Sequence, residues 1–300
     1  MAWLTVPEMT EVELAEQIRW EAEQHLAHDL RSVTLGYHVV ARRPAEGQMD
    51  VVLVAVERDR AARYVEVVRQ AGLRPTRCVL DTTALWAWYQ QAAPAPERPT
   101  AIADLGAAKV SVSACGAAGT LQYWRVAGRG GEAITERLCE QLGLSRDEAE
   151  QRKQACGAPA ASGGNYRTGY RAQGPVDDAR VERVVEEATE ELAQTLRRSI
   201  SFINEVQEPV ERVWITGGSE RLPRVTRHLH RAFEGKAEPW PRFPMDGLDA
   251  GPGIDPAQLG RWSCRLGVAL GLCCDPRPSL EVPGLGTRRG LGGWLRSLFG

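Results

Sequence analysis

The chain has 300 residues and a formal net charge of −2, a balance that excludes the strongly basic surface of a nucleic-acid-binding protein, so no nucleic-acid partner is expected. The N-terminal residues lack the basic region and apolar core of a signal peptide, and no apolar run is long enough to span a bilayer. The seven cysteines contain no C-x-x-C pair, which favours reduced thiols in a cytoplasmic protein. The length of the chain fits one large or two medium globular domains.

The first 75 residues predict a compact α+β unit. Five elements are expected, in the order strand, helix, strand, strand, helix, over residues 2–7, 10–26, 32–42, 49–57 and 58–71. Thr10 and Glu13 form a capping-box pattern at the start of the first helix. The run 49–57 is apolar almost throughout, as in strands that are buried on both faces.

A second group of elements follows this unit. Residues 78–81 predict a short strand, and residues 82–91 predict a helix. The helix carries three aromatic residues, Trp86, Trp88 and Tyr89. We expect these rings to pack in a core rather than to line a groove for a partner. The proline-rich run 93–99 then marks a boundary.

The stretch 99–126 predicts a three-stranded meander, and the rest of the chain is organised around it. Its first turn, Asp104-Leu105-Gly106, pairs an acidic residue with a glycine. Such a turn lets backbone amides approach a phosphate, while the carboxylate reaches the metal ion of the phosphate through water. A D-x-G turn is weak evidence by itself, because most such turns join ordinary hairpins.

The rest of the chain alternates helices with loops and one strand. The predicted segments are a glycine turn at 128–131, helices at 132–142 and 145–155, a polar loop at 157–175, a long helix at 177–206, a buried strand at 210–218, a helix at 222–233, an irregular segment at 234–259, a small-residue helix at 262–274 and a tail at 275–300. The long helix repeats its apolar residues at helical spacing.

Several of these segments occur in a recognisable order. They are LTVPEMTEVELAEQIRWEAEQHL, DLGAAKVSVS, GRGGEAITERL, LSRDEAEQRK, VWITGGSERLPRVTRHL and GVALGL. In this order, over about residues 1–275, the sequence resembles the PilM family of actin-like type IV pilus assembly proteins, which are related to FtsA. The resemblance implies an α/β, actin-like (ribonuclease H-like) two-lobed fold with an FtsA/PilM-type extra α+β subdomain.

The resemblance also implies a division of the chain. The expected parts are the extra (1C-like) subdomain at 1–75, a remnant of the first lobe with a linker at 76–98, and the second lobe at 99–233, of which 145–206 is the 2B-like part. An irregular segment and a helix that returns to the first lobe follow at 234–275, and a Pro/Gly-rich tail with a short amphipathic segment at 276–300. Family members carry a first phosphate turn ahead of these segments, in the N-terminal part of the first lobe. We expect that part to be missing here.

By resemblance, Asp104, Gly106 and Ala107 belong to a second phosphate turn for ATP, with Asp104 holding Mg²⁺ through water. The family usually offers Ser or Thr hydroxyls shortly after the glycine, whereas Ala107, Ala108 and Lys109 stand here. Only backbone amides and one ammonium group remain as donors from these three positions.

The adenosine side is implied in the same way. Glu150 and Lys153 match an A-E-x-x-K pair that touches ribose and base, and Gly217 and Gly218 match a loop that passes flat against the adenosine. Outside the resemblance, an exposed i,i+3 ion pair is the favoured interpretation of Glu150 and Lys153, and a plain strand-to-helix turn is the alternative for the two glycines. The glycines at 130 and 131 would stay clear of the phosphates.

Phosphoryl transfer needs clamps on the phosphates, a metal ion and an oriented water. With one phosphate turn absent and the other lacking hydroxyls, we expect weak or vestigial ATP binding, no catalytic residue and no turnover. A first phosphate hairpin encoded upstream would instead favour an active ATPase.

The resemblance implies a cytoplasmic scaffold that binds the N-terminal peptide of a PilN-like inner-membrane protein and through it lies at that membrane. Pilus cytoplasmic ATPases are further candidate partners. The equivalent scaffold of type II secretion or of mannose-sensitive pilus machinery remains an alternative. Residues 287–299 place apolar side chains at helical spacing among arginines, a pattern that resembles an interfacial helix. The Gly-Gly pair within it weakens helicity, so packing on the protein or fraying is favoured over contact with a membrane surface.

Overall fold

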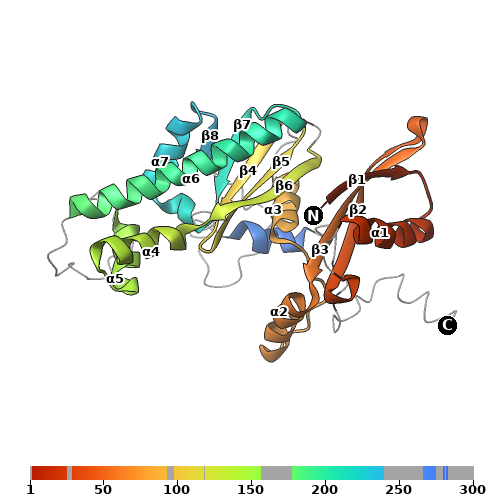
Figure 1. Cartoon of the computed structure of the whole chain (residues 1–300), viewed down its shortest axis with the longest axis horizontal. Helices are drawn as coiled ribbons and strands as arrows, with labels where there is room; N and C mark the ends of the chain where they lie inside the picture. The colour runs from red at the N-terminus through yellow and green to blue at the C-terminus, as the bar shows by residue number, and fades with distance from the viewer. Residues whose placement is uncertain are drawn as a thin grey trace. The chain divides into compact units, whose positions relative to one another are not determined.

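The computed structural model describes residues 2–25, 29–92, 98–117, 119–156, 178–239, 266–274, 280 and 282 (Figure 1). These residues belong to two compact units. Unit 1 comprises Met1–Trp88 with Ala269–Gly300, and unit 2 comprises Tyr89–Val268. The polar loop predicted at 157–175 and the amphipathic segment predicted at 287–299 lie outside the described residues.

Unit 1 contains a three-stranded antiparallel sheet with the order β1-β3-β2. Its elements are β1 (Ala2–Pro7), α1 (Glu11–His25), β2 (Val33–Arg43), β3 (Gln48–Glu57) and α2 (Arg58–Gln70). The predicted order of strands and helices is confirmed. At the start of α1, the Thr10 amide donates to Glu13 Oε2 at 2.8 Å, and the Glu13 amide donates to Thr10 Oγ1 at 3.4 Å.

Strand β3 lies in the middle of this sheet and is buried on both faces, as its apolar run predicts. Val51 and Leu53 face a core that includes Leu14 and Ile18 of α1. The alternate residues of β3 face a second core, made with α2 and with two residues from the far end of the chain: Val52, Val54, Ala61, Val65, Leu280 and Val282. Alternation along one strand therefore supplies both cores.

The strand predicted at 78–81 is wrong. Residues 78–80 are irregular and α3 (Asp81–Ala92) begins at Asp81. The Cys78 carbonyl accepts a hydrogen bond from the Leu280 amide at 2.7 Å, but an isolated bond does not make a ladder. Trp88 and Tyr89 of α3 are buried, at 7% and 3% exposure, which confirms the packing role expected of them.

The predicted small-residue helix is described over residues 266–273. A Cβ at Gly271 would overlap the backbone of Ala84 in α3, so this helix and α3 pack backbone to backbone. Six cysteines lie among the described residues, and all six are free thiols. Within the same residues, no helix is both long and apolar enough to cross a membrane.

Unit 2 contains a five-stranded sheet with the order β6-β5-β4-β7-β8. Its elements are β4 (Thr100–Leu105), β5 (Lys109–Cys115), β6 (Leu121–Arg129), α4 (Gly131–Leu142), α5 (Arg146–Ala155), α6 (Asp178–Val206), β7 (Arg212–Thr216), α7 (Pro223–Ala232) and β8 (Ala237–Pro239). Strands β4, β5 and β6 form the predicted antiparallel meander, and β7 pairs in parallel with β4 and β8. This is a ribonuclease H-like arrangement.

Helices α4, α6 and α7 pack on one face of this sheet, and α6 runs along it (Figure 1). The core residues include Leu138, Leu196, Ile203, Ile215 and Leu229. Strand β8 was not expected, because residues 234–259 read as irregular. Strand β8 has only three residues, too few to show an alternating pattern of apolar and polar residues in the sequence. It is a strand because it pairs with β7.

The unit 1 core predicts a matched pair of stability effects on α1. Leu14 is 1% exposed, so Leu14→Ala removes buried side-chain contacts and should lower the free energy of unfolding by about 2–5 kcal/mol. Val12 is 74% exposed on the same helix, and Val12→Ala should change the free energy of unfolding by less than about 0.5 kcal/mol. Urea denaturation followed by circular dichroism measures both, and equal effects would contradict the packing of α1 on β3.

Candidate functional site

Asp104 lies near the end of β4, between two neighbouring strands. Its register partners are Ser111 on β5 and Thr216 on β7, and register partners point to the same face of a sheet. Ser111 is 4% exposed and Thr216 is 1% exposed. The carboxylate is therefore flanked by two buried hydroxyl-bearing residues, which the sequence reading had not included. Their signal is visible only once the register is known.

The turn after β4 rests on the N-terminus of α4. Amides of Gly131 and Glu132 donate to the carbonyls of Gly106 and Ala107, at 2.9 and 2.8 Å. The Gly130 amide donates to the Ala108 carbonyl at 3.2 Å. A trans peptide carries its N–H opposite its C=O, so the amides that follow the Gly106 and Ala107 carbonyls, those of Ala107 and Ala108, point away from α4. The turn thus presents backbone donors on its other side.

The loop after β7 comes close to the same turn. A Cβ at Gly217, where φ is +92°, would lie 2.5 Å from Asp104 Oδ1 and 2.7 Å from the Leu105 carbonyl oxygen. A Cβ at Gly218 would meet nothing within 4 Å. One glycine therefore allows backbone to pack against the turn after β4, and the next leaves an open space beside the loop. Residues Gly218–Arg221 continue as the short helix η3.

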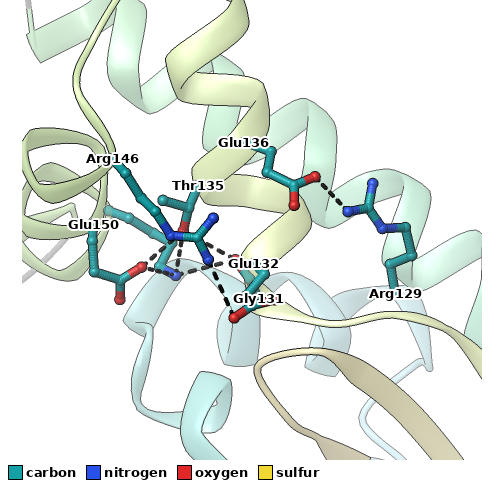
Figure 2. A network of polar contacts seen from close by, with 8 residues as sticks. Arg129, Gly131, Glu132, Thr135, Glu136, Arg146 and Glu150 are labelled. Atoms are coloured by element: carbon teal, nitrogen blue, oxygen red, sulfur yellow. Dashed lines mark hydrogen bonds and ion pairs between the residues drawn. The ribbon is translucent and has the colours of Figure 1, made fainter.

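Glu150 lies on α5 and meets α4 in one polar network (Figure 2). Lys153, also on α5, belongs to the same network. Lys153 Nζ donates to Glu150 Oε2 at 2.6 Å, to Thr135 Oγ1 at 2.8 Å and to the Gly131 carbonyl at 3.1 Å. An ammonium group has three N–H donors, so these three acceptors match its capacity. The Lys153 side chain is 8% exposed and that of Glu150 is 41% exposed. The two members of the pair therefore have different surroundings.

The network also shifts the acidity of Glu150. Partial burial raises the pKa of this carboxyl group, but hydrogen bonds from Lys153, Gln154 and Thr135 lower it by more. The net pKa of Glu150 is below the usual glutamate value, so the carboxylate is charged at neutral pH. Because Glu150 is partly exposed, this charge is also available to a ligand.

The polar network and the glycine loop are neighbours. A Cβ at Gly131 would lie 2.5 Å from Ser219 Oγ and 3.7 Å from Lys153 Nζ. The structure thus gathers the sequence-predicted residues around one place: Asp104, Gly106, Ala107, Glu150, Lys153, Gly217 and Gly218. Whether they bind a nucleotide stays a prediction.

Sequence reasoning missed Thr135 and Ser219. Thr135 is 1% exposed and stands four residues after Gly131 on α4, so a hydroxyl facing the glycine pair was the available signal. Ser219 is 8% exposed and directly follows the two loop glycines. Within the described residues, no group of three or more His, Cys, Asp or Glu side chains could hold a metal ion directly.

Unit 1 has a separate open hollow beside β1 and α1, with a volume of about 610 Å³. Its lining is acidic and partly apolar: Glu8, Met9, Glu13, Glu16 and Trp20, together with Pro7 and Gln17. Trp20 is 55% exposed. A hollow with three glutamates and a large exposed ring suits a ligand that carries both positive charge and apolar surface.

The strand order of unit 2, the acidic turn beside a glycine loop and the additional α+β sheet of unit 1 define an actin-like protein. The family model described as type IV pilus assembly protein PilM matches residues 4–275. The chain belongs to this family.

A solved structure supports the same family assignment. The chain is 25% identical to a protein in a structure titled "PilM-PilN type IV pilus biogenesis complex", with a TM-score of 0.73 over 90% of this chain and 74% of that one. It also resembles the ethanolamine utilization protein EutJ from Carboxydothermus hydrogenoformans, at 19% identity and a TM-score of 0.47 over 72% of this chain and 61% of that one. The second likeness is too low to support an argument.

The two loop glycines predict opposite outcomes for the same substitution. Gly217→Ala forces a side chain into a left-handed conformation and against Asp104 and Leu105, and should lower the free energy of unfolding by about 1–3 kcal/mol. Gly218→Ala adds a methyl group to open space and should leave the free energy of unfolding nearly unchanged. Thermal unfolding of the two variants compares them, and an equal loss would refute the close approach at Gly217.

Proposed function

We propose that the chain is a cytoplasmic, actin-like scaffold of type IV pilus assembly that binds the cytoplasmic N-terminal peptide of a PilN-like inner-membrane protein. The observation that carries this proposal is the family match over residues 4–275, together with the likeness to a PilM in complex with PilN. Through such a partner the protein would lie at the inner membrane. The proposed membrane contact of 287–299 and any binding of pilus ATPases rest on the sequence alone.

We place part of the peptide in the acidic hollow of unit 1. Cytoplasmic segments next to a membrane-spanning helix are enriched in Lys and Arg, so a peptide of this origin carries positive charge. The glutamates at 8, 13 and 16 provide the opposite charge, and Trp20 and Met9 provide apolar contact. Charge pairing at such a rim mainly raises the association rate and depends on salt.

Peptide titration tests this placement. Glu16→Lys reverses one charge of the hollow and should weaken binding of a PilN-like N-terminal peptide by about tenfold at low salt, with a smaller effect at high salt. Glu23→Lys makes the same change on α1 outside the hollow and is the matched control. Fluorescence anisotropy measures both. Equal weakening by the two variants would place the peptide elsewhere, and no binding by the folded wild-type chain would count against the scaffold proposal.

We further propose weak Mg-ATP binding at the unit 2 site. The fit rests on the turn amides that point away from α4, the open space beside Gly218 and the charged, partly exposed Glu150. In this arrangement the turn at Gly106 and Ala107 takes the phosphates, Asp104 takes the hydrated Mg²⁺, and Glu150 takes the ribose. The bound metal ion would supply charge neutralisation of the phosphates.

Calorimetry with purified protein tests the nucleotide proposal. Asp104→Asn should weaken Mg-ATP binding by about tenfold and leave the Mg²⁺-free component unchanged, because the negative charge that would hold the hydrated metal ion is removed. Asp147→Asn, an exposed carboxylate of the same unit, should have no effect. ATP turnover by the wild-type chain that Asp104→Asn abolishes would favour an active ATPase over a scaffold without turnover.

A further inference from the structure

We propose that Lys153 is a positioning residue of the phosphate turn and that it acts through the peptide group joining Gly131 to Glu132. This inference rests on the proposed nucleotide site and assigns Lys153 a role other than contact with ribose and base. Lys153 Nζ donates to the carbonyl of this peptide group at 3.1 Å. The N–H of the same group, on Glu132, donates to the Ala107 carbonyl at 2.8 Å.

The hydrogen bonds continue to the donors of the turn. The Ala107 carbonyl belongs to the peptide group whose N–H is that of Ala108, so two peptide groups connect the ammonium to the Ala108 amide. Hydrogen bonds in such a chain polarise one another, by about 10–30% per bond. The cation draws electron density from the Gly131 carbonyl, which makes the Glu132 N–H and then the Ala108 N–H better donors. An anionic ligand benefits from this direction of polarisation.

Burial separates Lys153 from a ligand-contacting role. Its side chain is 8% exposed and its acceptor Thr135 is 1% exposed, while Glu150 keeps 41% of its side chain exposed. To reach a ligand, the ammonium would have to give up one of three hydrogen bonds inside the protein, and two of these go to buried acceptors, the Thr135 hydroxyl and the Gly131 carbonyl. Glu150 can meet the ligand without such a loss, because its side chain is partly exposed.

Thr135 completes the positioning. Its hydroxyl lies 2.8 Å from Lys153 Nζ and 2.8 Å from Glu150 Oε2, and 3.3 Å from the Gly131 carbonyl oxygen. The first turn of α4 is thereby held to α5 by side chains, and the turn after β4 is held to α4 by backbone amides. Movement of α5 would therefore be transmitted to the phosphate turn.

Lys153→Met removes the ammonium and keeps the length of the side chain. In the full-length protein, the amide proton resonances of Glu132 and Ala108 should move upfield, and these amides should exchange with solvent about tenfold faster. Affinity for ADP should fall by about three- to tenfold, and affinity for adenosine by less than twofold, since the amides that weaken face phosphate. Gln151→Met, an exposed position on α5, is the matched control and should change none of these values.

Each result has a defined meaning. Equal losses for adenosine and ADP, with both amide resonances unchanged, would overturn the proposal and place Lys153 against the nucleoside. If the wild-type chain binds neither ligand, the nucleotide proposal fails, while the resonances and exchange rates of Glu132 and Ala108 still decide the positioning role. Should Lys153→Met not fold, Thr135→Val removes one hydroxyl of the network and should shift the same resonances in the same direction by less.

Discussion

The contact between the first turn of α4 and the turn after β4 is the constraint on which the unit 2 site depends. Three backbone amides at the start of the helix donate to three consecutive carbonyls of the turn, at Gly106, Ala107 and Ala108. The positive end of a helix dipole thus faces carbonyl oxygens, and the Ala107 and Ala108 amides point away from α4. Glycine at 130 is required for this, because a Cβ there would overlap Gly106 and Ala107.

The other parts of the site are arranged around this contact. The loop at Gly217 approaches the turn from β7, and the network of Lys153 and Thr135 holds α4 from the side of α5. Ala107 and Ala108 follow Gly106 and carry no hydroxyl, so the proposed phosphate contacts of this turn are backbone amides. Polar side chains that remain nearby, Ser111 and Thr216, belong to the flanking strands.

Unit 1 follows a different principle, because its central strand serves two cores. Alternate residues of β3 contact α1 on one face and α2 on the other, and the second core also includes Leu280 and Val282 from the far end of the chain. The unit thereby covers both faces of its three-stranded antiparallel sheet, although such a sheet can leave one face to water. The acidic hollow lies beside α1, whereas Leu280 and Val282 belong to the core on the α2 side of the sheet.

Local periodicity was sufficient to predict most elements, including the buried strand β3, the meander and the 29-residue helix α6, because apolar spacing reflects which face each element buries. The order of the D-x-G turn, the E-x-x-K pair and the double glycine was sufficient to indicate the family. Pairing partners decided the rest: residues 78–80 formed no strand and Ala237–Pro239 did. The surroundings of Lys153 likewise depend on Gly131, 22 residues away in the sequence. Only tertiary structure brings those two residues together, and so only it could separate a buried, fully hydrogen-bonded lysine from the exposed ion pair that spacing alone also allowed.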